Sequence, residues 1–150
     1  MLGHTVADPH GIEGPAGITK GLGLLDIKTT LVERKQLTKA TGRELKTQAS
    51  VRGYEMHIGR TSGPDTCRPM LELDGRPDGA VSSDGKVMGC YLHGLFAADP
   101  FRRSFLHRIY AGAISTEAYE TLVEQTLDAL ADHLEQHIKI DRLLAVAGLH

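Results

Sequence analysis

The sequence feature that most constrains the fold is an apolar run at residues 87–96, followed almost at once by the dipeptide Asp99-Pro100. The run carries one histidine, His93, directly before Gly94. A short apolar run between turn signals is typical of a buried strand, and aspartate followed by proline is typical of a helix start. The sequence therefore predicts a strand that ends at a histidine, with a helix just behind it.

Segments before this strand predict further strands. Residues 24–31 and 45–61 combine β-branched and aromatic residues with a rough alternation of apolar and polar positions. Three Asp-Gly pairs, which are typical of hairpin turns, begin at Asp74, Asp78 and Asp84. Residues 1–23 are rich in glycine and proline, which predicts a loop.

Two helices are predicted at the end of the chain. Asp99 is expected to cap the first helix, whose apolar residues recur at helical spacing over residues 101–110 and which Gly112 ends. Ser115 is expected to cap the second, whose apolar residues recur over residues 122–138. We expect the apolar stripe of each helix to face the core.

Length and charge limit the classes of protein that fit. A chain of 150 residues with 41% hydrophobic and 24% charged residues predicts one soluble domain, or a large piece of one, over residues 1–150. The net charge of −2 argues against nucleic acid and anionic membranes as partners, and no apolar run has the length of a membrane span. Residues 1–10 lack the pattern of a signal peptide, so a cytoplasmic protein is expected.

His93 is the first candidate catalytic residue. A histidine held rigidly at the end of a strand, beside a small neighbour that leaves room for substrate, suits a general base. The alternative is a core histidine whose ring is hydrogen-bonded to backbone groups. Cys67 and Cys90 fit neither a disulfide framework nor a metal motif, and Cys90 points to the opposite strand face from His93, which makes it a poor nucleophile.

Two other pairs of polar residues have spacings that suggest a site. Glu55 and His57 share one face of a predicted strand, which suits an acid/base or ligand pair but equally an exposed cross-strand ion pair. His133 and His137 lie one helical turn apart, yet residue 134 is leucine and a third ligand is missing. We therefore expect a solvated helix face there and no metal.

Four segments in order, residues 8–14, 21–25, 53–61 and 89–96, resemble the C-terminal glutamine amidotransferase domain of the cobyric acid synthase family. The cobyrinic acid a,c-diamide synthase family has a similar domain, but residues 53–61 and 89–96 read closer to cobyric acid synthase. The resemblance implies an α/β fold of the class I glutamine amidotransferase type. This is a three-layer sandwich with a mixed sheet, of which this chain would lack the N-terminal part.

The resemblance also implies a reaction. A cysteine thiolate attacks the side-chain amide of glutamine, a glutamyl thioester forms and ammonia leaves; by match of motif, His93 activates the thiol and protonates the amine. The ammonia would pass to an N-terminal synthetase domain. There ATP with Mg²⁺ would activate carboxylates of adenosylcobyrinic acid a,c-diamide for amidation in cobalamin biosynthesis. No cofactor is expected in this chain itself.

The chain departs from the family pattern in ways that matter for activity. The resemblance places the family's cysteine in a Cys-Gly-Gly segment a few residues before the point where this chain begins, so we expect both the nucleophile and the synthetase domain to lie outside residues 1–150. Leu95 stands where many class I enzymes carry the glutamate that orients the histidine. We expect Glu55 or a backbone carbonyl to orient it instead, and we expect Arg60, rather than Arg52, to contact glutamine.

Three hypotheses follow for the chain as a whole. The leading one is a C-terminal fragment of a glutamine-hydrolysing cobyric acid synthase that is inactive alone and exposes apolar sheet surface. The second is a non-catalytic module that retains an amidotransferase shell and binds a partner or ligand. The third is an enzyme that uses Cys90 as nucleophile. The coding sequence upstream of Met1 discriminates the first two.

Overall fold

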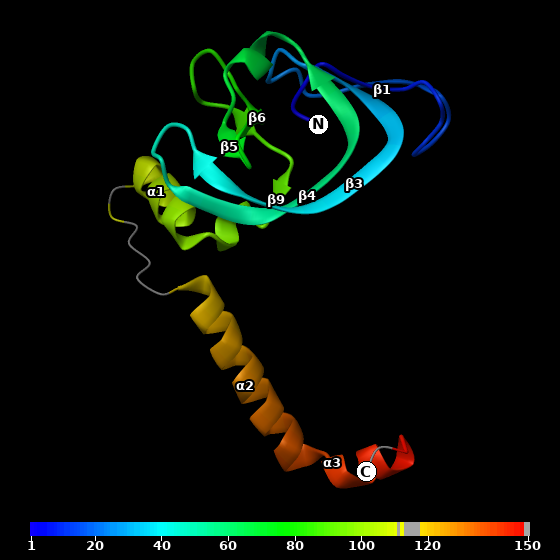
Figure 1. Ribbon diagram of the computed structural model, residues 1–150, viewed down its shortest axis with the longest axis vertical. Helices are drawn as coiled ribbons and strands as arrows, with labels where there is room; N and C mark the ends of the chain where they lie inside the picture. Colours follow the sequence, from blue (N-terminus) through cyan, green and yellow to red (C-terminus); the bar gives the residue numbers. More distant parts are fainter. Residues whose placement is uncertain (111, 113–117, 149–150) are drawn as a thin grey trace. The chain divides into compact units, whose positions relative to one another are not determined.

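The computed structural model describes residues 1–110, 112 and 118–148, without the side chains of residues 34–36 and 57. The chain divides into two compact units, Met1–Ile114 and Ser115–His150. The first unit carries the strands and one α-helix, and the second carries two helices (Figure 1). The predicted cap at Ser115 falls outside the described residues.

A mixed sheet forms the first unit. Its strand order is β2-β1-β3-β4-β9, and β5 pairs with both β3 and β6. The pair β1 and β3 is parallel and the other pairs are antiparallel. The strands of this sheet are β1 (Thr5–Asp8), β2 (Gly17–Lys20), β3 (Lys28–Glu44), β4 (Ser50–Ser62), β5 (Leu71–Leu73), β6 (Arg76–Asp78) and β9 (Leu92–His93). A separate two-stranded sheet pairs β7 (Ala80–Val81) with β8 (Met88–Gly89).

Strands β3 and β4 form a long curved ribbon that dominates the unit (Figure 1). Short 3₁₀ turns lie at η1 (Pro64–Cys67) and η2 (Leu95–Ala97). The α-helices are α1 (Asp99–Ile109), α2 (Tyr119–His137) and α3 (Ile140–Val146). Among the described residues, none of these helices has the length and apolar character that a membrane span needs.

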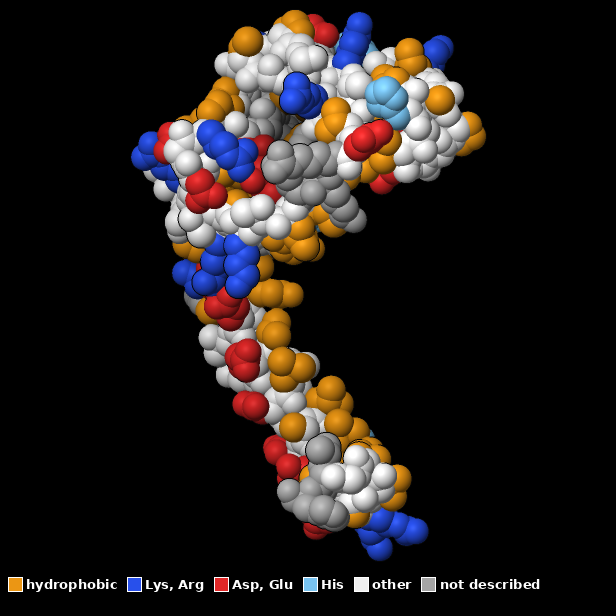
Figure 2. All heavy atoms as spheres, turned by 45° about the vertical axis from the view of Figure 1, so that its right-hand side comes forward, with side chains coloured by type: hydrophobic (Ala, Val, Ile, Leu, Met, Phe, Trp, Pro, Cys, Tyr) orange, Lys and Arg blue, Asp and Glu red, His pale blue; other side chains and the backbone are white. Residues whose placement is uncertain are grey.

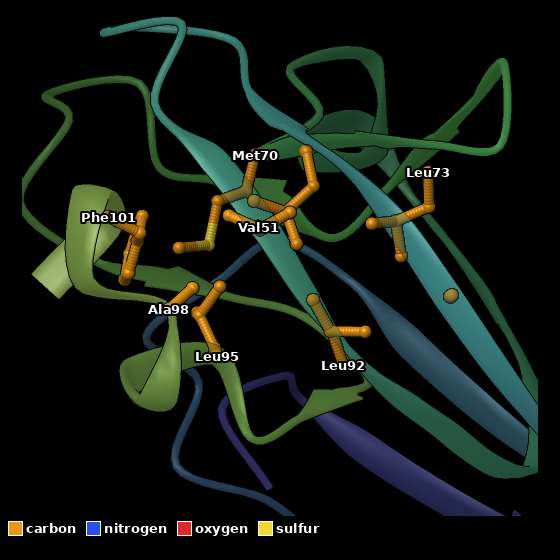
Figure 3. Close-up of a cluster of buried hydrophobic side chains, with 9 residues drawn as sticks. Val51, Met70, Leu73, Leu92, Leu95, Ala98 and Phe101 are labelled. Carbon is orange, nitrogen blue, oxygen red and sulfur yellow. The ribbon is translucent and has the colours of Figure 1, made fainter. Parts of the chain in front are cut away.

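The core packs against one side of the curved ribbon. Side chains from β4, β5, β9, η2 and α1 meet there, with Phe101, Leu71 and Leu73 fully buried (Figure 3). Residues of β4 alternate between this side and solvent, as the strand period requires, so that Val51 is buried and Arg52 is exposed. The remaining members of this core are Ala40, Met70, Leu92, Leu95 and Ala98.

The glycine-rich start of the chain is not all loop, contrary to the sequence expectation. Residues Thr5–Asp8 pair with the first residues of β3 and with β2, two partners that a local pattern does not reveal. Asp8 is the last residue of β1, and its carboxylate accepts hydrogen bonds from the backbone N–H groups of Ile12 (2.8 Å) and Glu13 (2.9 Å) in the loop that follows. These hydrogen bonds lower the pKa of Asp8 below its usual value, and the bond from Glu13 contributes most.

Strand and helix boundaries correct other expectations. The strand expected at residues 24–31 starts only at Lys28, because the chain bends before it. Asp74-Gly75 forms the predicted hairpin turn between β5 and β6, with φ of 47° and 78°. Asp84-Gly85 lies in the turn of the β7–β8 hairpin. Asp78-Gly79 lies at the end of β6 but does not form a hairpin turn, because β6 pairs with β5 and β7 pairs with β8. Asp99 is the first residue of α1 rather than its cap, a position taken by Ala98.

The run at residues 87–96 is two short strands, not one. Strand β8 pairs with β7 and strand β9 pairs with β4, so the chain changes sheet at Cys90-Tyr91. The apolar stripe of α1 is buried at its start, at Phe101, but Ile109 and Tyr110 at its end are exposed.

The apolar stripe of α2 is not buried within its own unit, contrary to the expectation from its spacing. No residue of α2 is buried, and its stripe residues Leu127, Leu130 and Leu134 are all exposed. Figure 2 shows hydrophobic side chains along one side of this helix and acidic ones along another. Two helices alone offer too little apolar surface to bury such a stripe.

Candidate active site at His93

His93 projects from the short strand β9 into solvent. Leu92 lies opposite Glu55 on β4, and His93 lies opposite Tyr54. Leu92 is buried in the core and His93 is exposed, because successive side chains of a strand point to opposite faces. The alternative of a buried core histidine is therefore wrong. The imidazole is accessible to a reacting group.

An aromatic ring covers one face of the imidazole. The rings of Tyr54 and His93 are stacked, with centroids 5.1 Å apart and planes inclined by 9°. The two residues are direct cross-strand neighbours, a relationship that brings their side chains together on one sheet face. Sequence patterns did not predict this contact, since the pairing of β9 with β4 spans about forty residues.

Two glycines determine the course of the backbone around His93. A Cβ on Gly53 would lie 1.9 Å from the carbonyl oxygen of His93, so any other residue would push β9 away from β4. Gly94 has φ of 82°, the left-handed region, and turns the chain from β9 into η2. The glycine beside His93 thus serves the turn of the backbone.

The turn after His93 is anchored to α1. The side chain of Arg102 donates a hydrogen bond to the carbonyl oxygen of Phe96 (2.9 Å) and forms an ion pair with Asp99. The ring of Phe96 meets Phe101 and Phe105 edge-on, at centroid distances of 5.4 and 5.1 Å. The helix therefore holds the segment that carries the histidine.

Glu55 lies on the other face of β4 from His93. Its carboxylate forms an ion pair with Arg76 of β6, and its side chain is 13% exposed. It lines a pocket of about 580 Å³ together with Asp78 and Cys90, and burial raises the pKa of Asp78. The structure does not bring Glu55 to His93. The side chain of His57 lies outside the described residues, so a pair between Glu55 and His57 stays a prediction.

Arg60 is on the same face of β4 as Tyr54 but far along the strand. Arg60 follows Tyr54 by six positions, about 20 Å along the strand. Arg52 is only two residues from Tyr54, about 7 Å along the strand, and is exposed on the same face. The geometry thus favours Arg52 over Arg60 as the arginine near His93.

Cys90 lies in an environment unsuited to a nucleophile. It lines the pocket on the Glu55 side, and burial raises the pKa of its thiol to about 11. The thiolate is the nucleophilic form, so Cys90 is poorly placed to attack a substrate near neutral pH. The hypothesis that Cys90 is the catalytic cysteine has no support in this geometry.

Differential alkylation tests this conclusion about Cys90. At pH 8 a thiol with a pKa of about 11 is ionised in about one molecule in a thousand, so Cys90 should react slowly with iodoacetamide. Cys67 is free and exposed and provides the internal comparison. Peptide mass spectrometry of the native chain should find Cys67 labelled first and Cys90 labelled fully only after unfolding. Rapid native labelling of Cys90 would revive the third hypothesis.

The histidine pair of α2 lies in the second unit. The rings of His133 and His137 stack with centroids 4.2 Å apart, and Nδ1 of His137 lies 2.8 Å from the carbonyl oxygen of His133. Among the described residues, no group of three or more histidine, cysteine, aspartate or glutamate side chains is placed to bind a metal ion.

Comparison with known proteins identifies the family of the domain that carries His93. A model of the CobB/CobQ-like glutamine amidotransferase domain matches residues 1–101, which include every strand and His93. The chain belongs to the CobB/CobQ-like glutamine amidotransferase family. The resemblance stated from the four motifs and the expected mixed α/β fold are both confirmed.

Curated relatives extend the similarity to nearly the whole chain. Cobyric acid synthase of Cereibacter sphaeroides is 55% identical over 147 residues, which cover 98% of this chain and 30% of that protein. The cobyric acid synthases of Bradyrhizobium diazoefficiens and Methylobacterium nodulans are 53% and 51% identical, again over 30% of their length. The chain therefore spans about 30% of the length of these relatives.

Proposed function

We propose that this chain supplies the histidine base of the glutaminase site in a cobyric acid synthase. The observation that carries the proposal is His93, exposed at the end of β9 and within the residues that the family model matches. Relatives that are 51–55% identical over almost the whole chain bear the name cobyric acid synthase. The whole enzyme would be a glutamine-dependent carbon–nitrogen ligase of the cytoplasm, acting in cobalamin biosynthesis.

In this proposal His93 first accepts a proton from the thiol and then donates it to the leaving nitrogen. Its imidazole takes the proton of a cysteine thiol that lies outside residues 1–150, and the thiolate attacks the side-chain amide carbon of glutamine. The imidazolium then gives its proton to the departing nitrogen, so that ammonia leaves and a thioester remains. Water hydrolyses the thioester to glutamate and restores the thiol. The exposed position of His93 leaves room for both reacting groups.

The ammonia is used elsewhere in the whole protein. We assign ATP, Mg²⁺ and adenosylcobyrinic acid a,c-diamide to a synthetase part outside residues 1–150, where ATP activates carboxylates of the diamide and ammonia converts them to amides. This chain would bind glutamine and contact the synthetase part. The proposal rests on the length and names of the relatives, of which this chain spans about 30%.

A segment exchange tests the proposal. The matching segment of 147 residues in Cereibacter sphaeroides cobyric acid synthase is replaced by this chain, to which it is 55% identical. The chimaera is expected to release glutamate from glutamine, and to amidate the diamide with glutamine or ammonium salts, at rates within about tenfold of the parent. Amidation with ammonium salts but not with glutamine would favour the second hypothesis, a non-catalytic module with an amidotransferase shell.

A further inference from the structure

The imidazole of His93 needs a group that fixes its orientation, and neither the side chain at position 95 nor that of Glu55 supplies one. Leu95 is buried in the core, so nothing polar reaches back from two residues downstream. Glu55 is paired with Arg76 on the far face of β4. The neighbour that does cover the ring is Tyr54.

We propose that Tyr54 is a positioning residue that holds the His93 imidazole by stacking, in place of a carboxylate. This inference rests on the function proposed above for His93. It adds to that function the residue that sets the plane of the catalytic ring.

The geometry of the stack explains how it could act. Planes inclined by 9° with centroids 5.1 Å apart are an offset-stacked pair, one of the favoured arrangements of aromatic rings. Such a contact restricts rotation of the imidazole about its Cβ–Cγ bond, because rotation would drive a ring edge into the tyrosine. Both ring nitrogens lie at the edge of the imidazole, so stacking leaves them available to a thiol and to a hydrogen-bond partner.

Tyr54 is itself held by the strand that carries it. Gly53 on one side permits the close approach of β4 to the His93 carbonyl, and Glu55 on the other is tied to Arg76. A platform on a rigid strand positions a catalytic group better than one on a loop. Tyr54 is 43% exposed, so packing in the core does not account for the placement of its ring.

Nuclear magnetic resonance on the full 150-residue chain tests the stack without any activity. The tyrosine ring current should shift the His93 Hδ2 and Hε1 resonances upfield in the parent chain and in Tyr54→Phe. In Tyr54→Leu, which keeps apolar bulk but has no ring current, these resonances should move downfield. Met56→Leu, two residues along on the same face, is the matched control and should leave them in place. Identical His93 shifts in the parent and Tyr54→Leu would overturn the inference.

Glutaminase kinetics on the chimaera test the catalytic consequence. Loss of the stack in Tyr54→Leu is expected to lower kcat about 3- to 10-fold with KM for glutamine unchanged, and Tyr54→Phe is expected to restore the parent kcat. A kcat in Tyr54→Leu equal to that of the parent, or one in Tyr54→Phe as low as in Tyr54→Leu, would overturn the inference. If the unsubstituted chimaera lacks glutaminase activity, the proposed function fails instead, and the resonance shifts still report the stack.

Discussion

Replacing His93 by asparagine is expected to lower glutamate release from glutamine by about 10²- to 10⁴-fold, the usual contribution of a general acid–base group. Asparagine can donate and accept hydrogen bonds, but it cannot take the thiol proton or return it to the leaving nitrogen. The measurement is the rate of glutamate formation by the chimaera. Amidation with ammonium salts should be unaffected, because ammonia supplied directly bypasses the histidine.

The matched control for this prediction is His107→Asn. His107 is also exposed in the first unit but lies on α1, so its replacement should leave glutamate release unchanged. A His93→Asn chimaera that hydrolyses glutamine at the parent rate would refute the role of His93. Equal losses with glutamine and with ammonium salts would instead show that the substitution damages the whole enzyme.

Replacing Glu44 by alanine is expected to lower the free energy of unfolding of the first unit by about 3 kcal/mol or more. Glu44 is almost fully buried at the end of β3, where Arg108 of α1 donates a hydrogen bond of 2.7 Å to its Oε1 and Thr47 donates to its Oε2. Without the carboxylate, the mostly buried guanidinium of Arg108 loses its compensating charge. Removing one partner of a buried pair costs more than the intact pair contributes.

A neighbouring ion pair provides the control for Glu44→Ala. Arg43 and Glu72 are joined by a 3.0 Å contact across β3 and β5, but their side chains are 50% and 38% exposed. Glu72→Ala should therefore cost at most about 1 kcal/mol. Urea unfolding followed through amide resonances of residues 1–110 measures both variants. Equal losses in the two variants would contradict the importance assigned to burial.

The pair of Glu44 and Arg108 also bears on the site. It joins the end of the β3–β4 ribbon to α1, and α1 holds the turn that follows His93 through Arg102. Weakening this attachment should let the segment that carries His93 move, so we expect glutamate release by the Glu44→Ala chimaera to fall at temperatures where the protein is still mostly folded.

Local patterns in the sequence are sufficient to determine several features of this protein. The motif around His93, the Asp74-Gly75 turn and the start of the helix near Asp99 are each decided by neighbouring residues. Turn glycines require particular φ angles, and helix starts depend on the first few residues, so these signals act over a short range. Four short segments in order were also enough to indicate the family.

Only the tertiary structure decided which residues meet His93. The glycine-rich start of the chain contains strands because β3 offers it a partner, and α2 exposes its stripe because its own unit offers it none. Tyr54 stacks on His93, while Glu55 turns to Arg76, because β9 pairs with β4 in one register rather than another. A shift of one residue in that register would exchange the two faces. Such pairing joins residues far apart in the chain. Periodicity alone therefore favoured Glu55 as the residue that orients His93, whereas the structure favours Tyr54.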